Sequence, residues 1–182
     1  MVAITPTQQF ADVYLIQPQK HSDERGFFME SFRESWLAEI APKQRFVQDN
    51  HSFSKQNVLR GLHYQLEQPQ AKLVRVVHGR IFDVVVDMRR SSPTFGKWQG
   101  FELSADSHLQ LWIPEGFAHG FYTLSETAEC LYRCTHYYHA PSEQSVRFDD
   151  PHLNIHWPLL AEPLLSPKDA NASSFNQAKY FQ

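Results

Sequence analysis

The stretch RIFDVVVDM, residues 80–88, decides the fold class of this chain. Its side chains alternate as in a β-strand, so that two different faces result. One face is apolar, with Phe82, Val84, Val86 and Met88; the other carries two carboxylates, with Asp83, Val85 and Asp87. At least one of these aspartates is therefore expected to face a polar interior or a partner subunit.

Short extended segments of the same kind lie on both sides of this stretch. The expected strands are 13–18, 27–32, 46–53, 58–65, 72–77, 80–88, 98–103, 108–113, 117–124 and 128–138. Turn residues separate them and almost no helical pattern intervenes, which indicates an antiparallel barrel or sandwich rather than a parallel α/β sheet. We predict an all-β jelly-roll barrel.

The flanking segments complete a single domain over residues 1–182. Residues 1–44 are expected to contain a polar turn at 21–26 and a short helix at 33–41, and to form a dimer contact. The barrel takes residues 45–148, and residues 149–182 wrap over it without strands. Ser166, Pro167 and Asp169 form a capping-box pattern that predicts a short C-terminal helix.

Composition restricts the function classes. The 182 residues carry a formal net charge of -3, which argues against whole-protein attraction to nucleic acid but permits an anionic small ligand. No apolar run reaches the roughly 18 residues that span a bilayer, and the N-terminus lacks a signal-peptide pattern. The expected location is the cytoplasm. Cys130 and Cys134, about 13 Å apart if they share one strand, are expected to stay reduced.

The stretch VLRGLHYQLEQPQAK, residues 58–72, is the first candidate for chemistry. A histidine in an apolar strand is more often a core residue, but His63 lies between Arg60 and Lys72. Two cations in one cleft suit a phosphate or a developing oxyanion. Strict alternation separates Arg60 from His63, so both reach one site only if Gly61 allows a bulge or sharp twist.

A second candidate is PEGFAHGF, residues 114–121, which resembles the second motif of the cupin superfamily. The first cupin motif normally supplies a second histidine and a glutamate to a metal, whereas this chain has His63-Tyr64-Gln65 and no glutamate at the required spacing. The sequence therefore predicts a metal-free cupin barrel in which His119 makes hydrogen bonds.

A third candidate is the tyrosine pair Tyr132 and Tyr138. Six residues apart, the two share one face of an extended strand. Packing explains them equally well by composition, but beside His63 one phenol suits proton donation and the other suits stacking on a base.

Together these segments resemble the dTDP-4-dehydrorhamnose 3,5-epimerase family over nearly the whole chain. The motifs that carry the resemblance are DERGFFMESF, QDN at 48–50, VLRGLHYQ, KLVRVVHGRIFDVVVDMR, SPTFGKW, LWIPEGFAHGF, LYRCTHYY and LSPKDA. The resemblance implies a thymidine-diphosphate keto-sugar substrate, inversion of the two carbons beside the carbonyl, and no redox or metal cofactor. The implied product is dTDP-4-keto-L-rhamnose for cell-surface polysaccharide.

The resemblance also assigns roles by position. His63 matches the general base, Tyr132 the proton donor, Asp169 the carboxylate that orients the histidine, and Lys72 the cation near the enolate oxygen; we expect Asp83 to pair with Lys72. Substrate-binding positions are Arg25, Glu30, Gln48, Asp49, Asn50, Arg60, His119, Tyr138, Glu143 and Lys168. The resemblance further implies a homodimer in which the region of Arg25 and Glu30 comes from the partner subunit.

Alternatives remain open at this point. His136, Ser145 and Phe148 depart from the usual family pattern, which leaves room for a single-carbon epimerase or a ketoisomerase of a related sugar. A sugar-nucleotide-binding barrel without turnover is a rival of another class. A metal-dependent cupin oxygenase is disfavoured because the first-motif ligands are missing.

Overall fold

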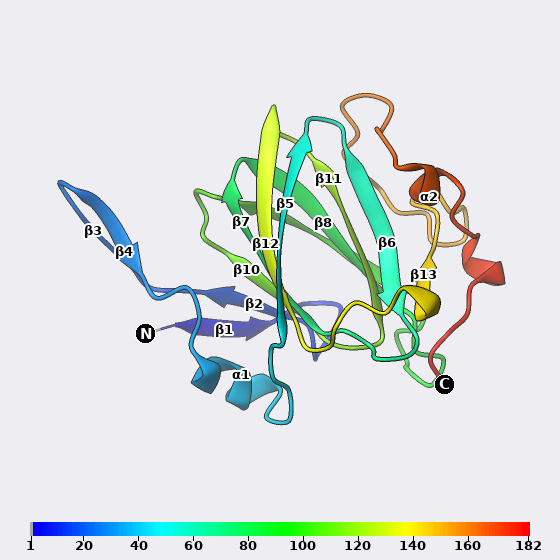
Figure 1. The fold of residues 1–182 in the computed structure, drawn as a ribbon, viewed down its shortest axis with the longest axis horizontal. Helices are drawn as coiled ribbons and strands as arrows, with labels where there is room; N and C mark the ends of the chain where they lie inside the picture. The colour runs from blue at the N-terminus through cyan, green and yellow to red at the C-terminus, as the bar shows by residue number, and fades with distance from the viewer. Residues whose placement is uncertain (1) are drawn as a thin grey trace.

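Two antiparallel sheets face each other in the computed structural model, which describes residues 2–182 (Figure 1). The six-stranded sheet has the order β1 (Ala3–Pro6), β2 (Tyr14–Gln17), β10 (Gln110–Ile113), β7 (Lys72–His78), β12 (Thr127–Cys134) and β5 (Gln48–Lys55). The five-stranded sheet has the order β13 (Glu143–Ser145), β6 (Leu59–Gln65), β11 (Phe117–Thr123), β8 (Arg80–Asp87) and β9 (Trp98–Ser104). The predicted jelly-roll class is confirmed.

The remaining elements are short. A separate hairpin pairs β3 (Lys20–Asp23) with β4 (Gly26–Met29). The helices are α1 (Glu34–Ile40), α2 (Pro167–Ala170) and the 3-10 turns η1 (Ala140–Ser142) and η2 (Phe175–Gln177). Within residues 2–182, no helix has the length and apolarity needed to cross a membrane.

Strand β8 shows why the alternation in RIFDVVVDM produces a central strand. Val85 is fully buried in the core between the two sheets, where it packs with residues such as Val74 and Leu111. Val84 and Val86, on the opposite face, are buried with Leu153 and Phe175 of the C-terminal segment. Both faces of the strand are thus covered, and the wrap predicted after residue 149 supplies the second cover.

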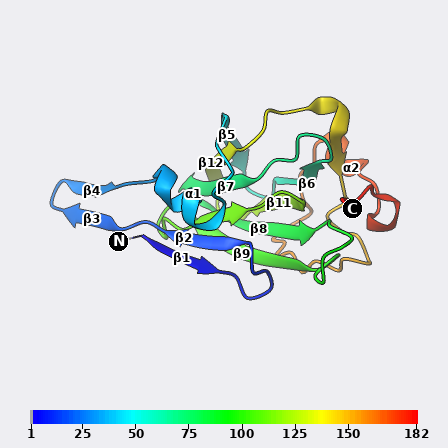
Figure 2. The ribbon, with the colours of Figure 1, turned by 90° about the horizontal axis from the view of Figure 1, so that it is seen from below.

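The N-terminal region differs from the expectation. Residues 20–29 form the β3–β4 hairpin, with Gly26 at φ +127°. Strand β3 occupies most of the turn expected at 21–26, and the strand expected at 27–32 is present as β4 but ends at Met29. The hairpin projects from the body of the molecule (Figure 2) and leaves Phe28 75% exposed. Its first strand is exposed at every position, so no burial pattern marks it in the sequence.

Strand β12 ends at Cys134, four residues before its expected end at 138. Beyond it, Thr135 ties back to Ala71, whose backbone N–H donates to the threonine hydroxyl at 2.9 Å. The carbonyl oxygen of Pro69 then makes a 2.8 Å hydrogen bond with His136 Nδ1. These side-chain contacts replace the sheet ladder and turn the chain toward β13, so Tyr132 and Tyr138 do not share a strand.

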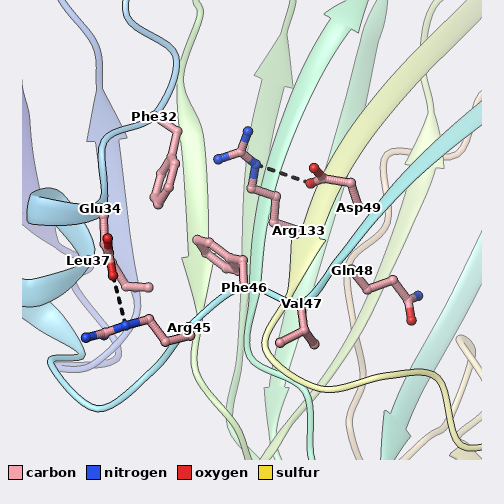
Figure 3. A pocket seen from close by; sticks show the side chains of 9 residues that line it. All are labelled: Phe32, Glu34, Leu37, Arg45, Phe46, Val47, Gln48, Asp49 and Arg133. Atoms are coloured by element: carbon pink, nitrogen blue, oxygen red, sulfur yellow. Dashed lines mark ion pairs between the residues drawn. The ribbon is translucent and has the colours of Figure 1, made fainter.

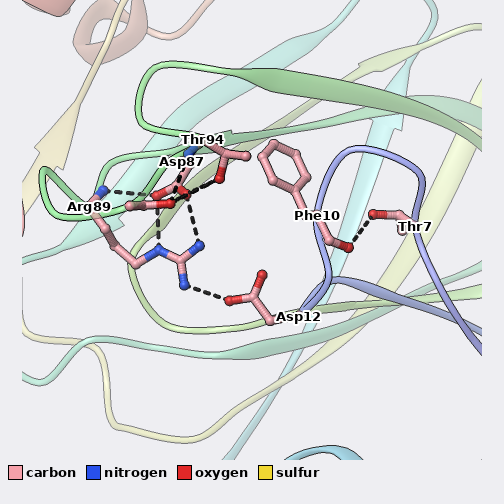
Figure 4. Close-up of polar contacts among 7 residues, drawn as sticks. Thr7, Phe10, Asp12, Asp87, Arg89 and Thr94 are labelled. Atoms are coloured by element: carbon pink, nitrogen blue, oxygen red, sulfur yellow. Dashed lines mark hydrogen bonds and ion pairs between the residues drawn. The ribbon is translucent and has the colours of Figure 1, made fainter.

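An ionic cluster around the buried Asp87 ties the end of β8 to Asp12 in the N-terminal segment (Figure 4). The Asp87 carboxylate is fully buried and accepts hydrogen bonds from Arg89, Ser92 and Thr94. Arg89 also pairs with Asp12 at 2.5 Å, and its backbone bridges to Phe181. Burial raises the pKa of Asp87, but these donors outweigh it and hold the pKa below its ordinary 3.8.

Candidate active site

A β-bulge in β6 brings Arg60 and His63 to one cavity. His63 pairs with His119 and Arg60 with Phe121, so three steps along β6 face two along β11. Gly61 makes this possible: its φ is +110°, and a Cβ there would lie 2.6 Å from the Cα of Gly120. The bulge predicted at Gly61 is present. Arg60 lies at the cavity rim, where its Nε donates to Ser54 Oγ at 3.0 Å.

The lining residues form two adjoining cavities. The outer cavity, 360 Å³, is lined by Gln48, Asn50, His63, Tyr64, Gln65, Gln70, Lys72, Tyr132, Tyr138 and Glu143. The inner cavity, 280 Å³, is lined by Ser52, Arg60, His63, Lys72, His119, Gly120, Phe121, Tyr132, Ser166, Lys168 and Asp169. His63, Lys72 and Tyr132 belong to both. All four residues expected to carry the chemistry therefore meet at one place.

His63 is held by a carboxylate from α2. Its Nε2 lies 2.5 Å from Asp169 Oδ1, although 106 positions separate the two residues in the chain. Burial of Asp169 raises the pKa of its carboxyl, but the hydrogen bond with His63 prevails and lowers the pKa below 3.8. The ionised Asp169 carboxylate accepts a hydrogen bond from the Nε2–H group of His63. The Nδ1 atom of the ring therefore carries no proton and can accept one.

Tyr132 and Lys72 are both half-buried where the two cavities meet. Burial raises the pKa of the Tyr132 phenol, so the phenol keeps its proton and stays a donor. Burial lowers the pKa of Lys72, and the nearby Cys134, Asp83 and Glu143 partly oppose this shift. A partly desolvated ammonium group interacts more strongly with an oxyanion beside it than a fully hydrated one does.

The expected pair between Lys72 and Asp83 is wrong. Asp83 Oδ2 instead lies 2.8 Å from His119 Nε2, and Asp83 acts on Lys72 only through its charge. The register explains the choice, because Asp83 is opposite Phe121 on the adjacent strand β11, which also carries His119. His119 thus makes a hydrogen bond, as predicted, and one of the β8 aspartates faces a polar interior.

The outer cavity is bordered by a hydrogen-bonded chain of three side chains. Tyr138 donates its hydroxyl proton to Glu143 Oε2 at 2.8 Å, and Lys168 Nζ lies 2.6 Å from Glu143 Oε1. Burial raises the pKa of Glu143, but Lys168 and Tyr138 outweigh it and lower the pKa. Gln48 extends the border: its Oε1 accepts the Tyr138 backbone N–H, and its Nε2 donates to Asn50.

Three expected binding residues lie elsewhere. Arg25 and Glu30 are in or beside the projecting hairpin and pair locally with Asp23 and Arg33. Asp49 points to the opposite side of β5 from Gln48, into a pocket beside α1, and pairs with Arg133 at 3.2 Å (Figure 3). Within this chain, these three side chains do not line either cavity.

Ser166 is the residue whose part in the site the sequence did not indicate. Its hydroxyl donates to Asp169 Oδ2 at 2.8 Å and accepts the Asp169 backbone N–H at 3.1 Å. The capping-box spacing predicted the helix start, and that same spacing places the hydroxyl against the carboxylate. His136, Ser145 and Phe148, whose identities depart from the family pattern, line neither cavity.

The position that cupins use for a second histidine has another role here. Gln65 is buried, donates to the carbonyl oxygen of Gln68 at 2.9 Å and accepts the backbone N–H of His139 at 3.0 Å. The Gln65 side chain therefore links the loop at Gln68 to the loop at His139. Residues 2–182 contain no group of three or more His, Cys, Asp and Glu side chains arranged to hold a metal ion.

The two sheets, the carboxylate-held imidazole and the half-buried phenol and lysine beside it define the class: a cupin-type β-sandwich with titratable side chains gathered in one cavity. The sequence profile of the dTDP-4-dehydrorhamnose 3,5-epimerase family matches residues 7–177. The chain belongs to this family.

Individual relatives agree with this assignment. The dTDP-4-dehydrorhamnose 3,5-epimerase of Neisseria gonorrhoeae is 56% identical over 92% of this chain; the match spans about half, 51%, of that protein. The Shigella flexneri enzyme of the same name is 53% identical, with 95% of this chain and 96% of that protein covered.

Solved structures of two kinds of epimerase are similar to the chain. A Legionella pneumophila dTDP-6-deoxy-D-glucose-3,5-epimerase in complex with dTDP-4-keto-L-rhamnose is 49% identical, with a TM-score of 0.95 and 100% coverage of both chains. A 3'-monoepimerase from Streptomyces bikiniensis in complex with dTDP-quinovose is 35% identical, with a TM-score of 0.87 and 93% and 86% coverage. The fold alone therefore does not separate double from single inversion.

Proposed function

We propose that the chain inverts both carbons that flank the 4-keto group of dTDP-4-dehydro-6-deoxy-D-glucose and so produces dTDP-4-dehydro-L-rhamnose. Family membership and the high identity to double epimerases support this substrate and reaction. The observation that carries the proposal is the 2.5 Å hydrogen bond between His63 and Asp169 in a cavity that Tyr132 and Lys72 also line.

The reaction balances with protons alone. His63 Nδ1 removes the proton from a carbon next to the ketone, and the C–H electrons move onto the carbonyl oxygen, where Lys72 stabilises the enolate. Tyr132 then delivers its phenolic proton to the other face of that carbon, which inverts it. His63 then releases its proton to water and Tyr132 regains one from water, which resets both groups. The same exchange at the second flanking carbon completes the conversion, and no electrons leave the substrate.

The two cavities together suit the nucleotide, with the base beside Tyr138 of the outer cavity and the diphosphate beside Arg60 and Lys168 of the inner cavity. Tyr138 is 56% exposed and offers a flat ring for stacking on the base, while Arg60 and Lys168 provide positive charge for the diphosphate. Gln48, Asn50, His119 and Glu143 supply further polar groups around the two cavities. Their roles as substrate contacts follow from family position and from this placement.

The reaction is tested by following the wild-type enzyme in deuterated water by NMR. Double inversion places deuterium at both flanking carbons of the product. Deuterium at one carbon indicates a single-carbon epimerase, the class to which the similar Streptomyces bikiniensis protein belongs. No deuterium at either carbon indicates a binding protein without turnover and refutes the proposal.

We further propose that the enzyme is a homodimer whose β3–β4 hairpin completes the site of the partner subunit. The hairpin projects from its own chain, exposes Phe27 and Phe28, and keeps Arg25 outside both cavities. In such a dimer, Arg25 and Glu30 contact the substrate that is bound in the partner subunit, not the one bound in their own. The cytoplasmic location and the use of the product in surface polysaccharide stay predictions.

Subunit complementation tests the hairpin proposal. Arg25→Ala and His63→Asn are each expected to inactivate the enzyme, but in a mixed dimer one site combines an intact His63 with an intact Arg25 from the partner. Unfolding and refolding the two variants together should restore about a quarter of wild-type activity, because half of the dimers are mixed and have one working site. No recovery from a mixture that refolds fully would refute the exchange.

A further inference from the structure

We infer that Ser166 is a positioning residue that fixes the Asp169 carboxylate and, through it, the proton-accepting nitrogen of His63; the inference rests on the proposed acid–base reaction. Asp169 lies on α2, a helix of only four residues, which by itself holds a side chain weakly. An additional restraint is therefore needed to keep Asp169 Oδ1 at 2.5 Å from His63.

The Ser166 hydroxyl supplies that restraint with both of its hydrogen-bonding capacities. It accepts the backbone N–H of Asp169 at 3.1 Å and donates its proton to Oδ2 of the same residue at 2.8 Å. The first bond is an ordinary N-cap. The second bond has no role in capping, since it occupies the carboxylate oxygen that does not face His63.

The two oxygens of Asp169 thus have different fixed partners. Asp169 is only 4% exposed, whereas Ser166 is exposed, so water that replaces the lost donor at Oδ2 enters from the Ser166 side and is a less fixed partner than the hydroxyl. Without the Ser166 proton, the carboxylate gains rotational freedom, and its pKa rises because one of the contacts that lower it is lost while the bond with His63 remains. Both changes weaken its hold on Nε2–H of His63 and allow the other ring tautomer, in which Nδ1 carries the proton and cannot act as base.

Three substitutions at Ser166 separate positioning from helix capping. Threonine retains the acceptor and the donor. Aspartate caps a helix as well as serine does, but when ionised it has no proton to donate and places a second carboxylate against Asp169. Alanine removes both functions. Ser174→Ala is the control for loss of a serine hydroxyl in the C-terminal segment: Ser174 also stands at an N-cap position, but it makes no side-chain cap hydrogen bond and its hydroxyl donates to Gln177 Oε1.

Activity is the first readout. Ser166→Thr and Ser174→Ala are expected to keep the wild-type kcat. Ser166→Ala and Ser166→Asp are expected to lose kcat by on the order of 10- to 100-fold with KM little changed. Wild-type kcat in Ser166→Asp together with a loss in Ser166→Ala would assign the effect to capping and overturn the inference.

The second readout does not depend on turnover. Nitrogen-15 NMR of the His63 ring in the complete enzyme reports which nitrogen carries the proton. The wild type and Ser166→Thr should keep the proton on Nε2, while Ser166→Asp and Ser166→Ala should show an increased share on Nδ1. An unchanged tautomer in both latter variants would refute the inference, even if the wild type proved to have no epimerase activity.

Discussion

At the residue scale, the chemistry of His63 depends on what occupies its other ring nitrogen. Asp169 binds Nε2, and the bulge at Gly61 turns the ring toward the cavity that Tyr132 and Lys72 line. His119 lies on the neighbouring strand in register with His63 and has its own aspartate, Asp83. Each histidine thus has a carboxylate that fixes its ring, and the proposed mechanism assigns the role of base to His63 alone.

Asp169→Asn tests this dependence. The amide cannot stabilise the imidazolium and offers an NH₂ group in place of an oxygen, so kcat should fall by on the order of 10²- to 10⁴-fold. The affinity for dTDP should change little, because Asp169 does not carry the positive charge that a diphosphate needs. Steady-state kinetics and calorimetric titration with dTDP measure the two quantities; an equal loss in both would contradict the orienting role.

The sequence predicted the members of the site better than their contacts. His63, Tyr132, Lys72 and Asp169 converge as expected, because their family positions determine which side chains meet. The predicted pairing of Asp83 with Lys72 was wrong, because strand alternation assigns a side chain to one face of the sheet but does not determine which residue it contacts there. Ser166 was predicted only as a helix cap, because the spacing between Ser166 and Asp169 is the same whether or not the Asp169 carboxylate also binds His63.

At the element scale, short strands with covered faces were predictable and exposed ones were not. Strand β8 was found within one residue because apolar residues cover both of its faces. The hairpin strand β3 was missed because all of its residues are exposed. Strand β13 was missed because its three residues, Glu143–Ser145, are polar and pair along a strand edge.

The bulge gives a prediction at this scale. Gly61→Ala adds a Cβ within 2.6 Å of both Gly120 Cα and His119 O, in a backbone region that costs a non-glycine residue about 1–3 kcal/mol in strain alone. We expect lower thermal stability and a large loss of kcat, because relief of the clash displaces His63. Gly26→Ala is the control: φ is +127° there, but nothing lies within 4 Å of the added Cβ.

The comparison isolates the effect of close strand approach. Both substitutions strain the backbone, and only Gly61→Ala also clashes with another strand. Equal losses of melting temperature in the two variants, with unchanged kcat in Gly61→Ala, would show that the bulge does not position the site.

At the scale of the whole molecule, the C-terminal segment covers the outer face of the five-stranded sheet and so helps to hold the site in place. The C-terminal segment buries the outer face of β8 and carries Lys168 and Asp169 to the cavity, so one segment serves packing and chemistry. The wrap was predicted from its prolines and lost alternation. Its exact path was not, because irregular segments have no periodic pattern that assigns contacts.

The Asp87 cluster is expected to secure this arrangement. Asp87→Asn leaves Arg89, 28% exposed in its side chain, without its buried partner and should lower the free energy of unfolding by about 3 kcal/mol. Asp149→Asn breaks an exposed pair with Arg147 and serves as the control with a small effect. Denaturant titration measures both; a similar small loss in the two variants would contradict the structural role.

The pH dependence of stability follows from the same cluster. The folded pKa of Asp87 is below its ordinary 3.8, so its contribution is complete above that value and is lost as the pH falls through the folded pKa. The wild-type free energy of unfolding should therefore decrease on acidification below about pH 4 more steeply than that of Asp87→Asn.

The central claim is that His63 and Tyr132 act on opposite faces of one carbon, and Tyr132→Phe in deuterated water tests it most directly. With the base intact and the acid removed, a deuteron returns from the face that lost the proton. We predict that NMR will show deuterium entering the substrate at a flanking carbon while no inverted product forms. Formation of doubly inverted product at the wild-type rate would contradict the account.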